Sequence, residues 1–147
     1  MIKQSDLILI SEIRTTITRL VKKLRKHTVT GMELSLTERS VMGLLKEEKE
    51  LLPNELAARE KIRNQSMSQI LNHLDELGYI NRRISKEDKR KSLISLSAKG
   101  ITAIEKLRNE KDTWLHEAVT NSCTAEEIIL LKKALVPLKK LVDFEED

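Results

Sequence analysis

Amide, hydroxyl and imidazole side chains that could bind the edges of nucleic-acid bases follow one face of a predicted helix at residues 64–77. Apolar residues three and four positions apart form the opposite face, and Gly78 stands where a left-handed residue ends a helix. No acidic residue of this helix precedes Asp75, so a phosphate backbone could approach without repulsion. An ordinary polar surface is the alternative. The candidate contacts are Arg63, Asn64, Gln65, Ser66, Ser68, Gln69, Asn72 and His73.

A second candidate group is basic and lies in one loop, SKEDKRK at residues 85–91. The segment from Arg82 to Lys91 contains six basic and two acidic residues. Its local charge of +4 equals the net charge of the whole chain. We interpret the basicity as focal, which favours a polyanion as partner, although a solvated loop is the alternative. Asp88 is too acidic to face a polyanion and is expected to hold the loop and orient an arginine. The candidates are Arg83, Lys86, Asp88, Lys89, Arg90 and Lys91.

Residues that could support catalysis or metal binding are few and scattered. The single cysteine, Cys123, has no identifiable histidine partner, and the three histidines lie apart without the spacing of metal ligands or an HExxH pattern. No glycine-rich loop could cradle a phosphate. The sequence therefore predicts no enzyme, no metal and no cofactor, and we expect Cys123 to be a small packing residue.

The chain has the length and composition of one helical domain, with 147 residues of which 39% are hydrophobic and 34% charged. Its longest apolar run near the start, Leu7 to Ile10, is too short for a signal peptide or a membrane-spanning helix. A lone cysteine cannot form an internal disulfide. We therefore expect a cytoplasmic protein with no membrane partner.

Apolar spacing predicts long helices near both ends of the chain and shorter ones between them. They are expected at residues 5–27, from 37, at 53–60, at 64–77, at 98–120 and from 125. Thr37 and Ser97 are predicted caps, Pro53 suits a first helical position, and Thr124 with Glu127 forms a capping box. Pro137 is expected to kink the last helix.

Two short alternating runs, residues 79–84 and 92–97, predict a hairpin whose tip is the charged loop. The side chains expected on one side of it are Ile80, Ile84, Ile94 and Leu96. A short helix, a turn, a helix with a polar face and then a basic-tipped hairpin follow the order of a winged helix-turn-helix. The predicted fold class is therefore mainly α with a small β-hairpin wing, flanked by long helices.

Apolar residues with three-four spacing also form seams in the first and last predicted helices. Such seams predict a homodimer built from the first, fifth and last helices, and packing of the seams on each other within one chain is the alternative. The expected interface residues are Ile10, Ile13, Ile17, Leu20, Leu131, Leu135 and Leu138. The predicted organisation is a dimerisation region at 1–34 and 98–147 around a DNA-binding region at 35–97, in one continuous domain.

The stretch ELAAREKIRNQSMSQILNHLDELGYINRRISKEDKRKSLISLSAKG resembles the DNA-binding core of the MarR family of bacterial transcriptional regulators. The likeness rests on an ordered set of positions. These are Leu56 and Ala57, Leu74 and Gly78, Ile80 with Arg82 and Arg83, the wing-tip pair Asp88 and Arg90, and Leu96, Ser97, Lys99 and Gly100. Glu60 and Lys61 depart from the family, which often has glycine here; a lysine in a left-handed conformation costs about 1 kcal/mol.

The resemblance implies a dimeric, sequence-specific regulator, expected to be a repressor, on a pseudo-palindromic operator of double-stranded DNA. Its fourth helix would enter the major groove and its wing the minor groove. A small aromatic or anionic effector is a further implied partner, and Met32, Met42, His27 and Trp114 could border its crevice, although such residues are usually core. The alternative is a helical adaptor or an RNA-binding module, for which three aromatic residues offer few stacking platforms.

Overall fold

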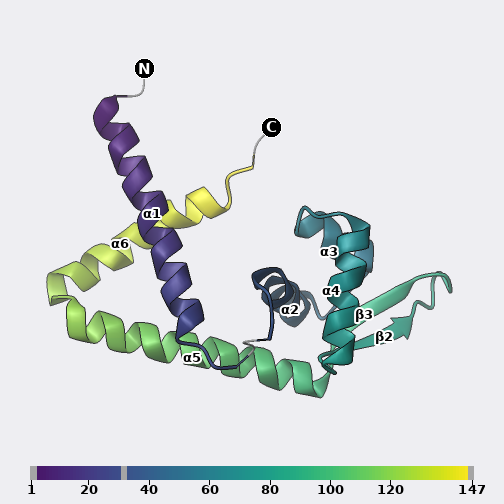
Figure 1. The fold of residues 1–147 in the computed structure, drawn as a ribbon. Coiled ribbons are helices and arrows are strands. Elements are labelled where there is room, and N and C mark those ends of the chain that lie inside the picture. The colour runs from purple at the N-terminus through teal and green to yellow at the C-terminus, as the bar shows by residue number, and fades with distance from the viewer. Residues whose placement is uncertain (1–2, 31–32, 146–147) are drawn as a thin grey trace. The chain divides into compact units, whose positions relative to one another are not determined.

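The computed structural model describes residues 3–30 and 33–145, and these are mainly helical (Figure 1). They form two compact units, Met1–Lys111 and Asp112–Asp147, and the helix α5 begins in the first and ends in the second. The elements are α1 (Gln4–Lys26), α2 (Leu36–Glu48), β1 (Glu50–Leu51), α3 (Pro53–Arg59), α4 (Asn64–Glu76), β2 (Ile80–Ile84), β3 (Ser92–Leu96), α5 (Ala98–Ser122) and α6 (Ala125–Val142). The predicted fold class is confirmed. No helix in the described ranges has the length and hydropathy that a bilayer crossing requires.

Helix α2 begins one residue before the predicted cap, so the assignment of Thr37 as its cap is wrong. Ser35 occupies the cap position, and its Oγ accepts a hydrogen bond from the Glu38 amide at 3.1 Å. Glu38 Oε2 accepts the Ser35 amide at 2.7 Å in return. This S-x-x-E box satisfies two amides that Thr37 could not satisfy together, which is why the helix starts at Leu36.

The turn between α3 and α4 contains the strained lysine that the sequence indicated. Lys61 has φ 53°, and its amide donates to Ala58 O at 3.2 Å while the Ile62 amide donates to Ala57 O at 3.0 Å. This pair of bonds is the helix ending that usually employs glycine. Asn64 is the first residue of α4, and Arg63 occupies the cap position with extended backbone and no side-chain capping bond.

The observed sheet contains one more strand than the predicted hairpin. Strand β1 pairs with β3, with Glu50 opposite Ser95, and β2 pairs with β3 on its other edge, which gives an antiparallel order β1-β3-β2. Ile80, Ile94 and Leu96 are buried, whereas Ile84 is 65% exposed. The prediction that Ile80, Ile84, Ile94 and Leu96 share one side is confirmed, because Ile80 stands opposite Leu96, and Ile94 stands opposite Arg82, between Ile80 and Ile84.

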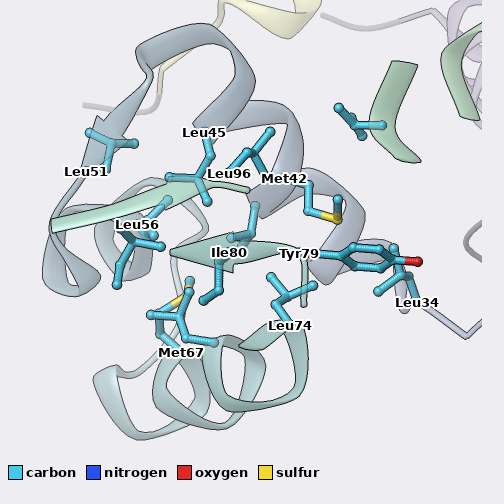
Figure 2. Packing of buried hydrophobic residues seen from close by; sticks show 14 of the residues in the cluster. Leu34, Met42, Leu45, Leu51, Leu56, Met67, Leu74, Tyr79, Ile80 and Leu96 are labelled. Carbon is cyan, nitrogen blue, oxygen red and sulfur yellow. The ribbon is translucent and has the colours of Figure 1, made fainter. Parts of the chain in front are cut away.

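The core of the first unit joins α2, α3, α4 and the sheet (Figure 2). Met67, Leu71 and Leu74 carry the buried stripe of α4, as predicted, and no more than 1% of each is exposed. The other buried members are Leu34, Val41, Met42, Leu45, Leu51, Leu56, Ala57, Tyr79, Ile80, Ile94, Leu96 and Ile104. Burying each large apolar side chain contributes on the order of 1.5–3 kcal/mol, so this cluster fixes α4 against the sheet.

The start of α5 and the start of α6 carry the predicted caps. The Gly100 amide donates to Ser97 Oγ at 3.0 Å, and the Glu127 amide donates to Thr124 Oγ1 at 3.2 Å. Pro137 lies inside α6, which continues to Val142, and the predicted kink there stays a prediction. The division into a dimerisation and a DNA-binding region also stays a prediction.

Candidate nucleic-acid interface

Helix α4 presents its predicted polar face to solvent. Its apolar stripe packs in the core, so the side chains on the opposite face of the helix point outward. Seven of the eight candidates are exposed: Arg63, Asn64, Gln65, Ser66, Ser68, Gln69 and Asn72. In the described part of the chain, Gln65 and Gln69 make no side-chain hydrogen bond, which leaves both amides free to donate and accept. Ser68 Oγ donates to Asn64 O at 3.0 Å, so its hydroxyl proton already takes part in a hydrogen bond. Contact with bases stays a prediction for the whole set.

Strand β2 holds the second half of α4 through one arginine that the sequence analysis did not assign to this task. Arg82 Nη2 donates to Asn72 Oδ1 at 3.2 Å, and its Nε lies 3.5 Å from Asp75 Oδ2. The Asn72 amide nitrogen keeps its two protons for an outside acceptor. Arg82 also offsets the acidic charge of Asp75 in the last turn of α4, so the face stays favourable to a polyanion.

His73, the eighth candidate, turns toward α2 instead of solvent. Its Nδ1 lies 2.5 Å from Glu38 Oε1, and the other oxygen of Glu38 caps α2 at Ser35. The Glu38 side chain is 9% exposed and that of His73 is 40% exposed. The pair therefore positions α4 on α2. A DNA contact from His73 stays a prediction, and Nε2 is the ring nitrogen that could make it.

We expect this pair to make stability depend on pH. The hydrogen bond with Glu38, aided by its charge and those of Glu76 and Glu33, raises the pKa of His73 above its ordinary value. A raised folded-state pKa contributes stability that is fully present below the unfolded pKa of about 6.5 and is lost as pH rises through the folded value. Urea midpoints of the wild type should therefore fall between pH 6 and 8.5 more than those of His73→Gln. His116→Gln, which removes an exposed histidine elsewhere, is the control; equal slopes in all three proteins would contradict the expectation.

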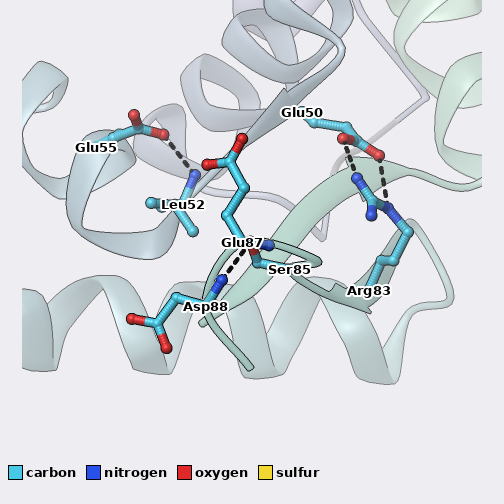
Figure 3. A network of polar contacts seen from close by, with 7 residues as sticks. All are labelled: Glu50, Leu52, Glu55, Arg83, Ser85, Glu87 and Asp88. Carbon is cyan, nitrogen blue, oxygen red and sulfur yellow. Dashed lines mark hydrogen bonds and ion pairs between the residues drawn. The ribbon is translucent and has the colours of Figure 1, made fainter. Parts of the chain in front are cut away.

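The tip of the wing is shaped by two side chains that accept backbone amides. Ser85 is buried, and its Oγ accepts the Glu87 amide at 3.3 Å and the Asp88 amide at 3.4 Å (Figure 3). Asp88 Oδ1 accepts both the Arg90 amide at 3.0 Å and its Nε at 3.2 Å, while Oδ2 accepts Nη2 at 3.3 Å. The hydrogen bonds from Arg90 hold the pKa of Asp88 below its usual value. Asp88 orients Arg90, as predicted.

The wing cations differ in their exposure and in the ion pairs that they make. The Arg90 side chain is 91% exposed even though Asp88 holds it, and Lys86, Lys89 and Lys91 are exposed with no ion pair in the described residues. Arg83 instead reaches across the sheet and donates to both oxygens of Glu50, at 3.2 and 2.8 Å (Figure 3). A DNA contact from Arg83 stays a prediction, and it would require this exposed pair to open.

The wing and α4 border one hollow of about 270 Å³. Asn64 and Ser68 line it from α4, and Arg90 and Lys91 line it from the wing. The structure thus brings the polar face and the basic loop, 20 or more residues apart in sequence, to the same surface. A ligand lying along this surface would meet amides and hydroxyls on one side and cations on the other, which matches the needs of a nucleic acid.

The residues proposed for an effector crevice are not equally suited to it. Met42 is fully buried in the core, so it supplies packing and does not border a crevice. Met32 lies outside the described residues. Across the ranges 3–30 and 33–145, no group of three or more histidines, cysteines and acidic residues could hold a metal ion.

Comparison with known proteins agrees with this geometry. The MarR family model matches residues 32–91. An HTH-type transcriptional regulator of Mycobacterium tuberculosis is 29% identical over 130 residues, 88% of this chain and 90% of that protein. A crystal structure from Pseudomonas aeruginosa is 26% identical, with a TM-score of 0.86 over 98% of this chain and all of that one. A mutant of E. coli MarR complexed with operator DNA is 19% identical, with a TM-score of 0.65 over 90% and 95% of the two chains.

Proposed function

The chain belongs to the MarR family of DNA-binding transcriptional regulators, which are not enzymes, and on that premise we propose that it is a dimeric, sequence-specific repressor. Helix α4 enters the major groove of a pseudo-palindromic operator, and the wing places Arg90 in the adjacent minor groove. The lysines of the wing supply sequence-independent attraction to phosphate, whereas Gln65, Gln69 and Asn72 supply directed hydrogen bonds to bases. Because such a regulator acts on chromosomal DNA, we place it in the cytoplasm.

One observation carries this proposal: the polar face of α4 and the wing cation Arg90 border the same hollow. Asp88 fixes the direction of the Arg90 guanidinium without covering it. A planar, weakly hydrated cation held at the tip of a projecting loop suits the narrow, strongly negative minor groove. The complex of E. coli MarR with operator DNA supports the same reading for a protein of this fold.

The dimer is supported by apolar surface that the chain does not cover. Helices α1 and α6 bury no residue, and Ile10, Leu131 and Leu135 are each about half exposed. Apolar patches of this extent rarely stay in water. A second copy would cover them and would place two α4 helices on half-sites about one helical turn apart.

Release by a small aromatic or anionic effector is supported by a hollow of about 450 Å³ near the start of α5. Tyr79 forms an aromatic wall, and Lys99 and Lys106 add two cations. Thr30 also borders the hollow, and its amide and hydroxyl donate to Glu110 at 3.0 and 2.7 Å. An anion with one ring has partners here for both its charge and its apolar surface.

We expect the amides of α4 to carry the sequence preference. Gln69→Ala removes a free amide that can pair with adenine, so it should cost about 1 to 3 kcal/mol on the operator and much less on random DNA. Lys89→Ala is the matched control from the wing. It should weaken binding to all sequences alike and lower the salt dependence by about one charge. An RNA-binding module or an adaptor would show no such difference, and a uniform loss for Gln69→Ala would contradict the proposal.

Arg90→Ala should weaken operator binding by about 1 to 3 kcal/mol while leaving thermal stability unchanged, because the side chain packs against nothing in the core. Arg90→Lys should recover only part of the loss, since lysine is a point charge that sheds water less readily. The measurement is a titration at one salt concentration against operators that differ only in flanking A·T content. Wild-type affinity of Arg90→Ala for every operator would show that the loop is merely a solvated turn.

A further inference from the structure

A second strongly basic surface lies on α1, outside the interface described above. Residues 13–30 contain six lysines and arginines and no acidic residue. The segment therefore has a charge of +6, compared with +4 for the wing loop and its flanks. The interpretation that basicity is focal at the wing is wrong, because acidic residues elsewhere in the chain conceal this segment in the net charge.

Four of these cations form one stripe along the helix. Arg19, Lys22, Lys23 and Lys26 have the spacing i, i+3, i+4 and i+7 that places side chains on one helix face. All four are exposed and border, with His27, a single hollow of about 330 Å³. None of the four makes an ion pair within the described residues. The charge of this face is therefore uncompensated by the chain.

The stripe lies on the side of α1 away from its apolar seam. At 3.6 residues per turn, the centre of the stripe and the centre of the seam through Ile13, Ile17 and Leu20 are about 140° apart. A partner that covers the seam, such as the second copy proposed above, leaves the stripe in solvent. The two faces therefore need different partners.

We propose that this stripe is a sequence-independent binding surface for the phosphates of duplex DNA. From Arg19 to Lys26 the helix rises about 10 Å, a length over which one DNA strand presents about three phosphates. Lysine and arginine on flexible stems can follow that spacing without reading bases. The inference goes beyond the operator contacts of α4 and the wing, and it rests on the proposed function only in taking duplex DNA as the ligand.

Two other anionic partners fit this arrangement less well. A basic helix that lies on a membrane surface inserts its apolar face into the lipid and keeps its cations beside that face. Here the centre of the stripe lies about 140° from the centre of the seam, so most of the cations would point into water when the seam met lipid. An acidic segment of a protein would match the charge too, but the even rise of the stripe along the helix suits the evenly spaced phosphates of a DNA strand better.

The test removes the stripe and a matched set of charges from elsewhere. The variant is Arg19→Gln/Lys22→Gln/Lys23→Gln/Lys26→Gln. The control is Lys132→Gln/Lys133→Gln/Lys139→Gln/Lys140→Gln in α6, where residues 125–145 hold four basic and four acidic residues. Both lose four charges. Lys22→Gln/Lys26→Gln serves if the larger variant does not fold. For each protein, the affinity for the operator fragment and for long random duplex DNA is measured from 50 to 200 mM salt, together with binding to vesicles of anionic lipid.

On long random DNA, we expect the slope of log affinity against log salt concentration to be smaller by about 2 or more in the stripe variant than in the wild type. From 50 to 200 mM salt, the affinity of the wild type should therefore fall about tenfold more than that of the variant. The control should lose less, and the ratio of operator to random affinity should be unchanged. Equal losses in variant and control, or no loss in either, would overturn the proposal. So would loss of vesicle binding with an unchanged DNA slope. A wild type that does not prefer its operator would instead overturn the proposed function.

Discussion

Gly100→Ala should destabilise the protein by about 2 to 4 kcal/mol, the largest effect that we expect from adding a single methyl group. A Cβ at Gly100 would stand 2.9 Å from the carbonyl carbon of Tyr79 and closer still to its oxygen. Both atoms are backbone, and the Tyr79 oxygen already accepts the Ser97 amide at 2.9 Å. Helix α5 would have to move away from the end of α4 to make room.

That junction joins α4, the proposed recognition helix, to α5, so the substitution should also weaken operator binding. Gly78 ends α4 with φ 76°, Ser97 Oγ donates to its carbonyl at 2.5 Å, and Lys99 Nζ donates to Leu77 O at 2.8 Å. Gly43→Ala is the matched control, because a Cβ there meets no atom within 4 Å in the middle of α2. It should stabilise the protein by about 0.5 to 1 kcal/mol. Urea unfolding of both variants decides the matter, and a Gly100→Ala protein as stable as the wild type would show that the junction is loosely packed.

Leu135→Glu should separate the proposed dimer and reduce operator affinity by about 100-fold or more, although the residue lies outside the proposed DNA-binding region. A carboxylate in the apolar seam would be desolvated without a partner, and two heads that are no longer linked lose the gain of binding two half-sites together. Light scattering should give a mass near the 16.9 kDa of one chain in place of twice that value.

Val136→Glu is the control for this substitution. Val136 is 61% exposed on the same helix but lies about 100° around from Leu135, off the seam. It should stay dimeric and bind the operator as the wild type does. A wild-type chain that scatters as a single copy, or a Leu135→Glu protein that stays dimeric, would contradict the assignment of the seam.

The elements that the sequence predicted well are those whose signals are local. The stripe of Met67, Leu71 and Leu74, the left-handed Gly78 and the cap at Ser97 each depend on neighbours within one or two turns, and all are confirmed. Ser35 and Glu38 also form an S-x-x-E pattern that indicates a cap at Ser35, whereas the prediction of Thr37 rests on its position closer to the apolar run.

The features that were missed depend on pairing between distant segments. Strand β1 is only Glu50 and Leu51, too short for any periodicity, and it exists because β3 offers it a free edge. His73 and Glu38 are 35 positions apart, so the sequence does not indicate the contact between them. Arg82 likewise holds Asn72 from ten residues away. Propensity and spacing contain no information on such contacts.

The most direct test of sequence-specific recognition by a dimer is to pass a pool of random duplex DNA over the purified protein and sequence the fragments that it retains. We predict enrichment of a pseudo-palindrome whose half-sites are centred about 10 base pairs apart, flanked by A·T pairs where the wings reach the minor groove. The same selection with Gln69→Ala should give a weaker preference at the bases that α4 contacts. A retained pool with the composition of the input would contradict the account.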